Sequence, residues 1–508
     1  MRPKPPMPAQ ANVETISAPV GGWNALDALE QMPPNDAPIL TNWVPYTTSC
    51  NMRSGYSKFA TGFAGQVETV MTYAGLTNSK LFAASGTSIY DITSGGAIGA
   101  PVQTGLSNAR WQYTNISNAG SSYLYMVNGA DSARYYNGTV FSTPILSGVT
   151  SANLININLH KNRLWFVEKN TLNAWYLATS AIAGPATKFA LTGVVQKGGS
   201  LVAMATWTID GGYGVDDYAV FITSKGEILV YQGSDPSDST TWSLISDYQI
   251  GSPIGRRCYM KYQGDLLIIT QDGLFPMSGA LQSSRTNPQV ALSYKIQYAM
   301  SLAVSSYSAN FGWQVFQFPK ENLIWVNVPI ATGSSQQQYV MTTLPNKAWC
   351  NFTGWAANCW ELFNDDPYFG GNQFVGHAWD TLADAGTNIV CDGLQAFNYF
   401  NSPEKKQFTM IRPFLNTNGS PNILASLNID FSLADTTAPL SFTPTSYATW
   451  DSGIWDTSVW GGDLTLTALW QGANGIGNAA GVRLKSASQG LQVQWTACSV
   501  VWRKGGIL

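Results

Sequence analysis

The stretch YAVFITSKGEILVYQG, Tyr218–Gly233, decides the fold. Two runs of aromatic and β-branched residues flank a polar turn that contains Lys225-Gly226, and glycine suits a tight turn whose backbone needs a positive φ. This pattern predicts a β-hairpin. One small twisted sheet cannot bury both of its faces alone, so we expect the hairpin to stack against further units of the same kind.

Six other stretches of the chain share this design, and Asp272-Gly273 and Asn128-Gly129 mark turns in two of them. The seven stretches begin at Leu81, Tyr123, Leu164, Tyr218, Leu266, Leu323 and Asn372. Successive starts are 41 to 57 residues apart, and periods of about 40–50 residues are typical of propeller blades. We predict an all-β fold, a degenerate β-propeller of six or seven blades. An elongated β-solenoid is the alternative.

A helical pattern interrupts the repeat between residues 291 and 310. Leu292, Ile296, Met300 and Val304 recur every four residues and therefore share one face of a helix. We predict an inserted helix packed on the propeller, and a partner surface is the alternative for its apolar stripe.

The repeat pattern of the sequence ends near residue 401. Three domains follow from this reading: an N-terminal segment over 1–65, the propeller-like repeat over 66–401 and a small C-terminal β-domain over 402–508. The last domain carries Trp450, Trp455 and Trp460, five residues apart, a spacing that matches neither a strand face nor a helix face. These tryptophans are a sugar-stacking platform or a loop packed on its own domain.

Composition narrows the class of protein. Only 11% of the 508 residues are charged, against about a quarter in a typical soluble domain, and the net charge is −3. This charge balance gives no strongly basic surface of the kind that binds nucleic acid. A weakly charged surface suits a subunit covered by its neighbours, or a secreted polar β-protein. The longest apolar runs, such as LLII from Leu266, are strand-sized, so we expect no membrane span.

The cysteines and the N-terminus indicate the place of synthesis. The six cysteines lie far apart, and the opening MRPKPPMPAQ lacks the apolar run of a signal peptide. We expect reduced cysteines that serve as packing residues, and synthesis in a cytoplasm.

Residues for catalysis are sparse. The two histidines, His160 and His377, have no nucleophile motif or metal-spaced partner nearby, so both are predicted to be structural. Paired carboxylates could serve a glycosidase, and the candidates are Asp210, Asp216, Asp217, Asp235, Asp238, Asp365 and Asp366. Asp-Pro and Asp-Gly are also ordinary turn residues. We expect no enzyme activity, no cofactor and no metal.

One compact basic element stands out, GRRCYMKYQG, with Arg256, Arg257 and Lys261. These side chains could contact DNA phosphates if an axial channel carried DNA. Pairing with local acids is the alternative.

The N-terminal segment resembles a known family. The similarity runs through Gly21-Gly22, Asn24, Asp27, Met32-Pro33, Asp36-Ala37, Leu40, Asn42-Trp43, Pro45 and Arg53-Ser54-Gly55, and it continues in WDSGIWDTSVWGG and the closing Gly505-Gly506. This pattern is similar to the tail nozzle proteins of short-tailed bacteriophages, also called tail hub or packaged-DNA-stabilisation proteins.

The resemblance implies a structural virion protein. Six copies would form a ring below the portal and adaptor rings, enclose the DNA exit channel, help to retain packaged DNA and dock tail fibres or spikes. DNA would pass without sequence-specific binding, which suits the mildly negative net charge. The protein would reside in the virion tail after synthesis in the bacterial host.

The proline-rich segment Met32–Pro45 gains a role from this resemblance. We predict that Asp36 caps a short helical turn and that the segment is a stiff strap. Ile39, Leu40 and Trp43 would then contact a neighbouring subunit or the adaptor ring at little entropic cost. The alternative is that the strap closes against the chain's own propeller or C-terminal domain.

Two other functions remain open at this point. A carbohydrate-active propeller enzyme requires an acidic pocket at the propeller axis. A monomeric carbohydrate-binding adhesin requires an exposed series of tryptophans and no ring.

Overall fold

The computed structural model describes residues 11–210, 215–280, 287–331, 335–440 and 464–505. Their contacts divide the chain into two compact units. Unit 1 is built from residues up to 57, from 339–354 and from residues after 378; unit 2 is built from 58–338 and 355–378. The series Trp450, Trp455 and Trp460 lies outside the described residues.

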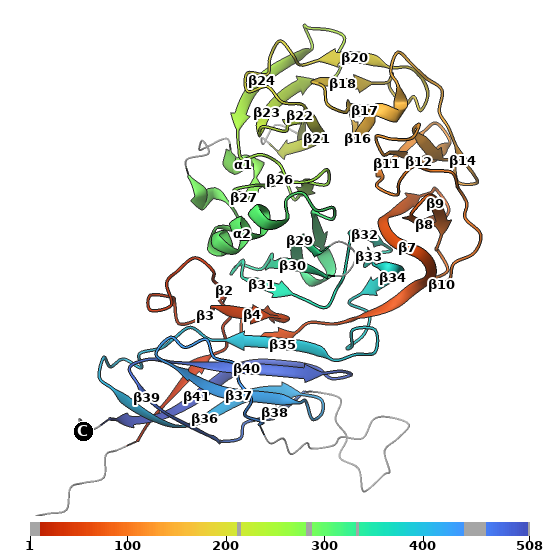
Figure 1. Cartoon of the computed structure of the whole chain (residues 1–508). Helices are drawn as coiled ribbons and strands as arrows, with labels where there is room; N and C mark the ends of the chain where they lie inside the picture. The colour runs from red at the N-terminus through yellow and green to blue at the C-terminus, as the bar shows by residue number, and fades with distance from the viewer. Residues whose placement is uncertain (1–10, 211–214, 281–286, 332–334, 441–463, 506–508) are drawn as a thin grey trace, which may run out of the picture. The chain divides into compact units, whose positions relative to one another are not determined.

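Unit 2 contains seven groups of antiparallel strands, which we call blades, arranged in a ring (Figure 1). The first three blades are β7 (Tyr56–Ala74), β8 (Ser79–Ser85) and β9 (Ser88–Asp91); β11 (Gln112–Asn118), β12 (Ser121–Val127), β13 (Arg134–Tyr136) and β14 (Phe141–Ser142); and β16 (Leu154–His160), β17 (Arg163–Glu168), β18 (Asn173–Tyr176) and β20 (Thr187–Ala190).

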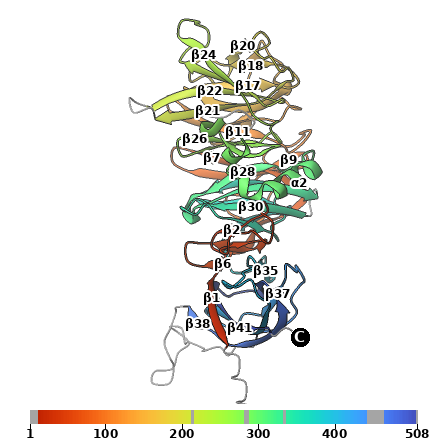
Figure 2. The ribbon, with the colours of Figure 1, turned by 90° about the vertical axis from the view of Figure 1, so that its left-hand side faces the viewer.

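The last four blades complete the ring, which Figure 2 shows from its edge. They are β21 (Leu201–Asp210), β22 (Val215–Thr223), β23 (Glu227–Gly233) and β24 (Trp242–Gln249); β25 (Tyr259–Tyr262), β26 (Asp265–Thr270) and β27 (Gly273–Pro276); β28 (Gln314–Phe318), β29 (Leu323–Ala331) and β30 (Ser335–Thr342), of which residues up to 338 belong to unit 2; and β32 (Cys359–Phe363), β33 (Asp366–Gly370) and β34 (Asn372–Ala378).

Short elements connect the blades. They are β10 (Gly96–Ala97), β15 (Leu146–Ser147), β19 (Gly184–Pro185), helices α1 (Met277–Ala280) and α2 (Gln297–Tyr307), and the 3-10 helices η1 (Ser151–Asn153), η2 (Pro288–Val290), η3 (Tyr294–Ile296) and η4 (Pro319–Glu321).

Neighbouring blades bury each other's apolar faces, which is the reason that the ring is stable. Met71 and Phe82 of the first blade share a core with Leu124 of the second. Similar layers join the second blade to the third, the third to the fourth, the fourth to the fifth and the seventh to the first. A twisted sheet of three or four strands is covered in this way on both faces.

Strand β7 closes the ring. Its residues Val67–Ala74 pair with β8 in the first blade, and the same 19-residue strand pairs with β34 of the seventh blade. One continuous strand therefore joins the first blade to the last by backbone hydrogen bonds.

The predicted all-β propeller is confirmed, and the solenoid alternative is wrong. Six of the seven predicted stretches begin on or beside the second strand of a blade, and the seventh begins on β34. The hairpin that decided the prediction joins β22 to β23, with Gly226 at φ +77°. A Cβ atom on Gly226 would lie 2.3 Å from the Ile250 carbonyl oxygen.

The inserted helix is present but shorter than predicted. Helix α2 covers Gln297–Tyr307, so Leu292 lies before it, while Ile296 precedes its first residue. Met300 and Val304 are buried, and α2 packs on β27 and β29. The apolar stripe therefore serves packing within unit 2.

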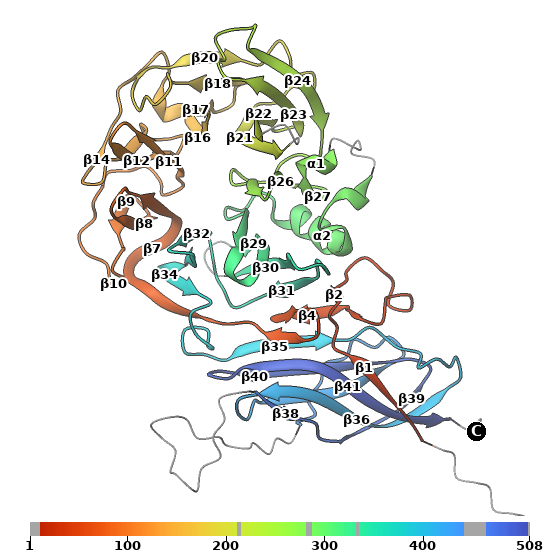
Figure 3. The ribbon, with the colours of Figure 1, turned by 180° about the vertical axis from the view of Figure 1, so that it is seen from behind.

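Unit 1 contains two sheets and a short parallel pair. In the first sheet the order is β38 (Thr465–Thr467), β36 (Lys406–Thr417), β41 (Val493–Lys504), β6 (Cys50–Met52) and β5 (Trp43–Pro45), with β1 (Asn12–Ser17) beside β41 and β39 (Gln471–Gly477) beside β36 (Figure 3). The second contains β31 (Trp349–Phe352), β4 (Ile39–Thr41), β35 (Ile389–Leu394), β40 (Ala480–Ser488) and β37 (Ile423–Ile429); β2 (Gly22–Trp23) pairs with β3 (Asp36–Ala37).

The predicted helical turn in the proline-rich segment is wrong, because the segment forms three short strands. Asp36 is in β3, and its carboxylate accepts a hydrogen bond from Asn24 Nδ2 at 2.8 Å rather than capping a helix. Strand β4 lies between β31 and β35, whose backbones satisfy it on both sides. Pro45 lies in the edge strand β5, where a missing backbone donor is tolerated.

The residues expected to contact another subunit are buried within unit 1 instead. Leu40 and Trp43 are at most 1% exposed, and Ile39 packs against the cluster around Leu394. The Trp43 ring meets that of Trp495 edge-on, with centroids 6.0 Å apart. These contacts match the alternative reading, in which the segment closes against the C-terminal part of its own chain.

The two units also differ from the predicted division at residues 65 and 401. The N-terminal segment belongs to the same unit as the C-terminal strands, because β1, β4, β5 and β6 are members of its two sheets. Residues 339–354 and 379–401 also belong to unit 1, although the repeat was expected to continue to 401.

Candidate functional sites

The centre of the unit 2 ring gathers polar side chains from several blades. The first strands of neighbouring blades lie side by side there, as β11, β16 and β21 do (Figure 1). Side chains on these strands bond to the backbone of the next strand: Asn156 Oδ1 accepts from Met204 N at 3.0 Å, and Gln314 Nε2 donates to Trp360 O at 2.9 Å. Such bonds hold the inner strands in register.

Arg257 crosses the centre of the ring. It comes from the segment before β25, and its Nη2 donates to Thr69 Oγ1 at 2.7 Å and to the carbonyl oxygens of Glu68 and Trp111, each at 3.1 Å. A side chain of the fifth blade thus binds the inner edges of the first and second blades. Arg256 reaches the Asn128 carbonyl oxygen with Nη1, at 3.1 Å.

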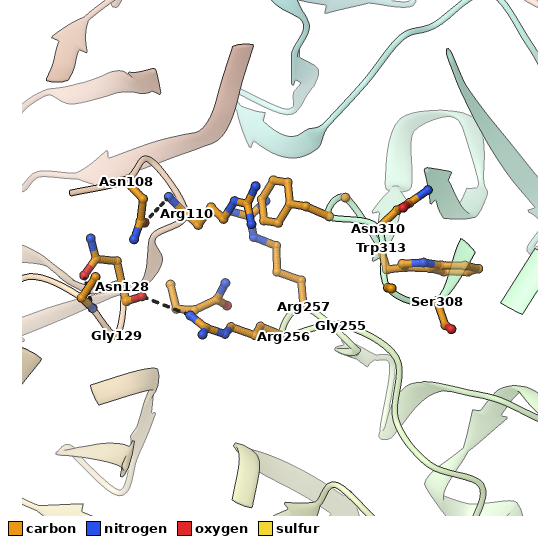
Figure 4. A pocket seen from close by; sticks show the side chains of 15 residues that line it. Asn108, Arg110, Asn128, Gly129, Gly255, Arg256, Arg257, Ser308, Asn310 and Trp313 are labelled. Carbon is orange, nitrogen blue, oxygen red and sulfur yellow. Dashed lines mark hydrogen bonds between the residues drawn. The ribbon is translucent and has the colours of Figure 1, made fainter. Parts of the chain in front are cut away.

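These two arginines line a cavity of about 330 Å³, which we call the axial pocket (Figure 4). Its described walls contain three arginines, several amide side chains and two aromatic rings, and no carboxylate. The lining residues are Asn108, Arg110, Gln112, Asn128, Gly129, Ala130, Gly255, Arg256, Arg257, Ser308, Ala309, Asn310, Phe311, Gly312 and Trp313. Guanidinium groups favour oxyanions, so the pocket is suited to a negatively charged ligand.

Phe311 orders two of the guanidinium groups. The Arg110 Cζ lies 4.5 Å from the centre of the Phe311 ring, and that of Arg257 lies 5.5 Å from it. Arg110 is also paired through Nε with Glu68, at 3.0 Å. Cation–π contacts restrict both side chains and leave most of their N–H donors unused.

Arg256 is the least neutralised of the three arginines. Burial and the charge of Arg110 both lower its pKa from the ordinary value. No carboxylate among the described residues forms an ion pair with Arg256. The axial pocket therefore concentrates positive charge.

A second cavity of about 220 Å³ also has Arg256 and Arg257 in its wall, together with Tyr113, Asn156 and Tyr259. Glu361, in strand β32 of the seventh blade, lies next to Tyr113. Its carboxylate accepts a hydrogen bond from the Tyr113 hydroxyl. Burial raises the pKa of Glu361 to about 7, so this carboxyl is only partly ionised near neutral pH.

The basic element of the sequence divides in the structure. Arg256 and Arg257 lie in the axial pocket, whereas Lys261 is exposed on β25 and lines neither cavity. Sequence reasoning missed Arg110 and Phe311, because each stands alone in a loop and only the closed ring brings them to Arg257.

The histidines occupy structural positions. His160 is 2% exposed, and its Nδ1 lies 3.1 Å from Thr206 Oγ1. Burial lowers its pKa to about 4, so it is neutral at physiological pH. The His377 ring stacks on that of Tyr368, with centroids 4.6 Å apart and Asp366 Oδ2 3.7 Å from Nε2.

The described candidate carboxylates serve local structure. Asp235 and Asp238 each accept bonds from a residue two positions on, and Asp217 accepts one from Thr208. Asp366 pairs with Lys320 at 2.6 Å, and Asp365 lies in the turn between β32 and β33 with φ +64°. The side chains of Asp210 and Asp216 lie outside the described residues.

Thiols, metals and membranes give no further site in the described part of the chain. All six cysteines are buried and unpaired, which agrees with their prediction as packing residues. No group of three or more potential metal ligands occurs among the described residues. No described helix has both the length and the apolar character needed to cross a membrane.

Unit 1 presents an apolar surface on the outer face of β36, β38 and β39. Leu466 lies opposite Asn416, and Ile476 lies opposite Gln407. A register shift between Phe408 and Met410 places Gln407 on the same face as the partly exposed even-numbered residues from Met410 to Asn416, so all four side chains share this face. Leu466 is 57% exposed and Ile476 is 63% exposed.

Aromatic residues extend this outer face. Trp470 is 39% exposed, and the Arg412 guanidinium lies between its ring and that of Phe414, at 4.6 and 4.8 Å. Met410 on the same strand is 38% exposed. We call this surface, formed by Met410, Phe414, Leu466, Trp470 and Ile476, the outer apolar face.

Comparisons with known proteins bear on the fold only. No family model and no curated protein matches the chain. Solved structures that it resembles include YCF48 from Cyanidioschyzon merolae, at 12% identity over 66% of this chain and 96% of that chain, with a TM-score of 0.33. An exo-beta-1,3-galactanase from Phanerochaete chrysosporium is 11% identical over 85% of this chain and 100% of that chain, with a TM-score of 0.29.

The computationally designed Ika8 protein is another, at 11% identity over 64% of this chain and 97% of that chain, with a TM-score of 0.32. Similarities of this size carry no argument about activity. The propeller assignment rests on the strand pairing and on the shared cores between blades.

Proposed function

We propose that this chain is a structural subunit of a short-tailed bacteriophage. In this proposal six copies form the tail nozzle ring below the portal and the adaptor ring, enclose the DNA exit channel, help to retain the packaged genome and dock fibres or spikes. The protein is made in the host cytoplasm and resides in the virion tail.

The observation that supports assembly is the outer apolar face of unit 1. Its side chains are exposed in a chain whose surface carries few charges. Contiguous exposed apolar residues on a soluble protein mark an interaction surface. We propose that a second copy of this chain covers the face in the ring, as subunits of closed rings cover each other.

Several residues that carry the family resemblance have structural roles in unit 1. Gly22 has φ +87°, and a Cβ there would lie 2.6 Å from the Trp349 carbonyl oxygen; Gly55 approaches Ala383 O in the same way. Arg53 is wholly buried and paired with Asp384. These three positions are therefore ones that the fold of unit 1 requires.

Electron microscopy of the native particle tests this function. We expect sixfold symmetry around an axial channel, with about 329 kDa contributed by six chains of 54.9 kDa. A particle in which this chain is monomeric and surrounds no channel would overturn the proposal.

Variants locate the interface. Leu466→Ser combined with Ile476→Ser should strongly reduce incorporation into the ring and leave the thermal unfolding midpoint nearly unchanged, because both side chains are already exposed. Ile145→Ser in unit 2, where Ile145 is 82% exposed, is the matched control and should assemble normally. Equal incorporation of both variants would exclude the outer apolar face as the ring contact.

A further inference from the structure

The axial pocket of unit 2 has the properties of a binding site that does not depend on the assembly of six copies. Its volume of about 330 Å³ lies in the range of small-molecule pockets, about 300–1,000 Å³. Every lining residue belongs to the described part of unit 2, so the pocket is complete within one chain.

The charge balance of the pocket is unusual for this protein. Only 27 of its 508 residues are Lys or Arg, yet three arginines line this one cavity. Glu68 compensates Arg110, at 3.0 Å, while no described carboxylate forms an ion pair with Arg256 or Arg257. The ionised fraction of the buried Glu361 interacts electrostatically with Arg257, so the charge of Arg256 is the one left to be balanced by something that enters the cavity.

The donors in the pocket are also underused. Among the described residues Arg256 donates through Nη1 alone, and Arg257 donates through Nη2 alone, although each guanidinium carries five N–H groups. Asn108 uses its side-chain oxygen to accept from the Arg110 backbone, which leaves its amide donors unused (Figure 4). Both arginines are held by their carbonyl partners, so the site is ordered before a ligand arrives.

We propose that the axial pocket binds a small multivalent oxyanion, a phosphate ester or a carboxylate, through Arg256, Arg257 and Arg110. The planar guanidinium fork matches phosphate and carboxylate oxygens in pairs. Arg110 and Arg257 already lie against the Phe311 ring, so a neutral sugar would compete with these cations for that aromatic surface. The volume admits a ligand of nucleotide or sugar-phosphate size and excludes duplex DNA.

Titration calorimetry of the full chain with sodium pyrophosphate tests the site at constant ionic strength. We expect one pyrophosphate per chain, and at least about tenfold weaker binding in Arg256→Gln. Lys261→Gln is the matched control, because it removes a charge five residues away that lines neither cavity, and its affinity should stay within about twofold. Inorganic phosphate and glucuronate, used in separate titrations, distinguish a phosphate site from a carboxylate site, and glucose should not bind.

Two results would overturn the proposal: no binding of pyrophosphate, phosphate or glucuronate, or equal weakening in Arg256→Gln and Lys261→Gln. If Arg256→Gln does not fold, hydrogen exchange of the unaltered chain decides. Pyrophosphate should then slow exchange in loops 108–112, 128–130, 255–257 and 308–313, and uniform or absent protection excludes the site. Neither result affects the proposed assembly of six copies, whose contact surface is the outer apolar face of unit 1.

Discussion

Arg53 shows how much one residue of the N-terminal segment does for unit 1. Its guanidinium is fully buried and binds both carboxylate oxygens of Asp384, at 2.8 and 2.6 Å. Nε donates to Asn42 Oδ1 at 2.9 Å, and the terminal nitrogens donate to the carbonyl oxygens of Ser54 and Thr353. One side chain thus joins three separate stretches of the chain.

Arg53→Leu should destabilise unit 1 by about 3–5 kcal/mol, because Asp384 would remain as a buried charge without its partner. Chemical denaturation followed by tryptophan fluorescence measures the loss. Lys320→Gln is the control, since the exposed Lys320–Asp366 pair should contribute less than about 1 kcal/mol. Losses of similar size in the two variants would mean that the Arg53 network is not a main source of stability.

His160 makes stability depend on pH. Its pKa is about 4 in the folded chain against an ordinary value of 6.5, because burial disfavours the charged ring. Between pH values of about 4 and 6.5, the unfolded chain therefore binds a proton at His160 that the folded chain does not bind. Stability is consequently lost as the pH falls from about 6.5 towards 4.

Measured against His160→Gln, the unaltered protein should lose about 2–3 kcal/mol more of its unfolding free energy between pH 7.5 and 4.5. Urea unfolding at a series of pH values checks this difference. Parallel pH profiles for the two proteins would show that His160 does not titrate as a buried group.

Strand β7 carries the closure of the propeller at the scale of an element. Within it, the hydroxyl of Thr69 donates to Ala109 O at 2.6 Å and accepts from Trp111 N at 3.0 Å and from Arg257 Nη2 at 2.7 Å. Three blades therefore meet at one buried hydroxyl.

Thr69→Val keeps the shape of the side chain and removes all three bonds. We expect a loss of about 2–4 kcal/mol, because the partner groups remain buried without their hydrogen bonds. Thr240→Val, which removes the bond of an exposed hydroxyl to Asp238, should change stability by less than about 1 kcal/mol. Thermal unfolding of the two variants separates these effects, and equal midpoints would contradict a special role for Thr69.

The elements also show which parts of the fold the sequence could predict. The hairpin β22–β23 was predictable because its apolar runs and Gly226 lie within 16 residues of each other. Strand β4 was not, since its three residues become a strand only by pairing with β31 and β35, more than 300 positions later. The axial pocket was unpredictable for the same reason, because Arg110, Arg257 and Phe311 meet only when the ring closes.

At the scale of the whole molecule the chain passes between the two units four times, so that neither unit is a continuous stretch. The predicted C-terminal domain, 402–508, contains only part of the two sheets of unit 1. In the first sheet β41 pairs with β1 and β6, and in the second β40 pairs with β35, all of which lie before residue 402.

A fragment of residues 402–508 should therefore fail to fold alone. Without β1, β6 and β35 it would expose the strand edges of β41 and β40, together with the core side chains Val482 and Trp495. We expect poor dispersion in its amide NMR spectrum and no cooperative unfolding transition, whereas the full chain should show both dispersion and cooperative unfolding. A folded, monomeric 402–508 fragment would contradict this prediction, because the C-terminal strands would then form an independent domain. The N-terminal segment would in that case pack onto the domain without being part of its fold.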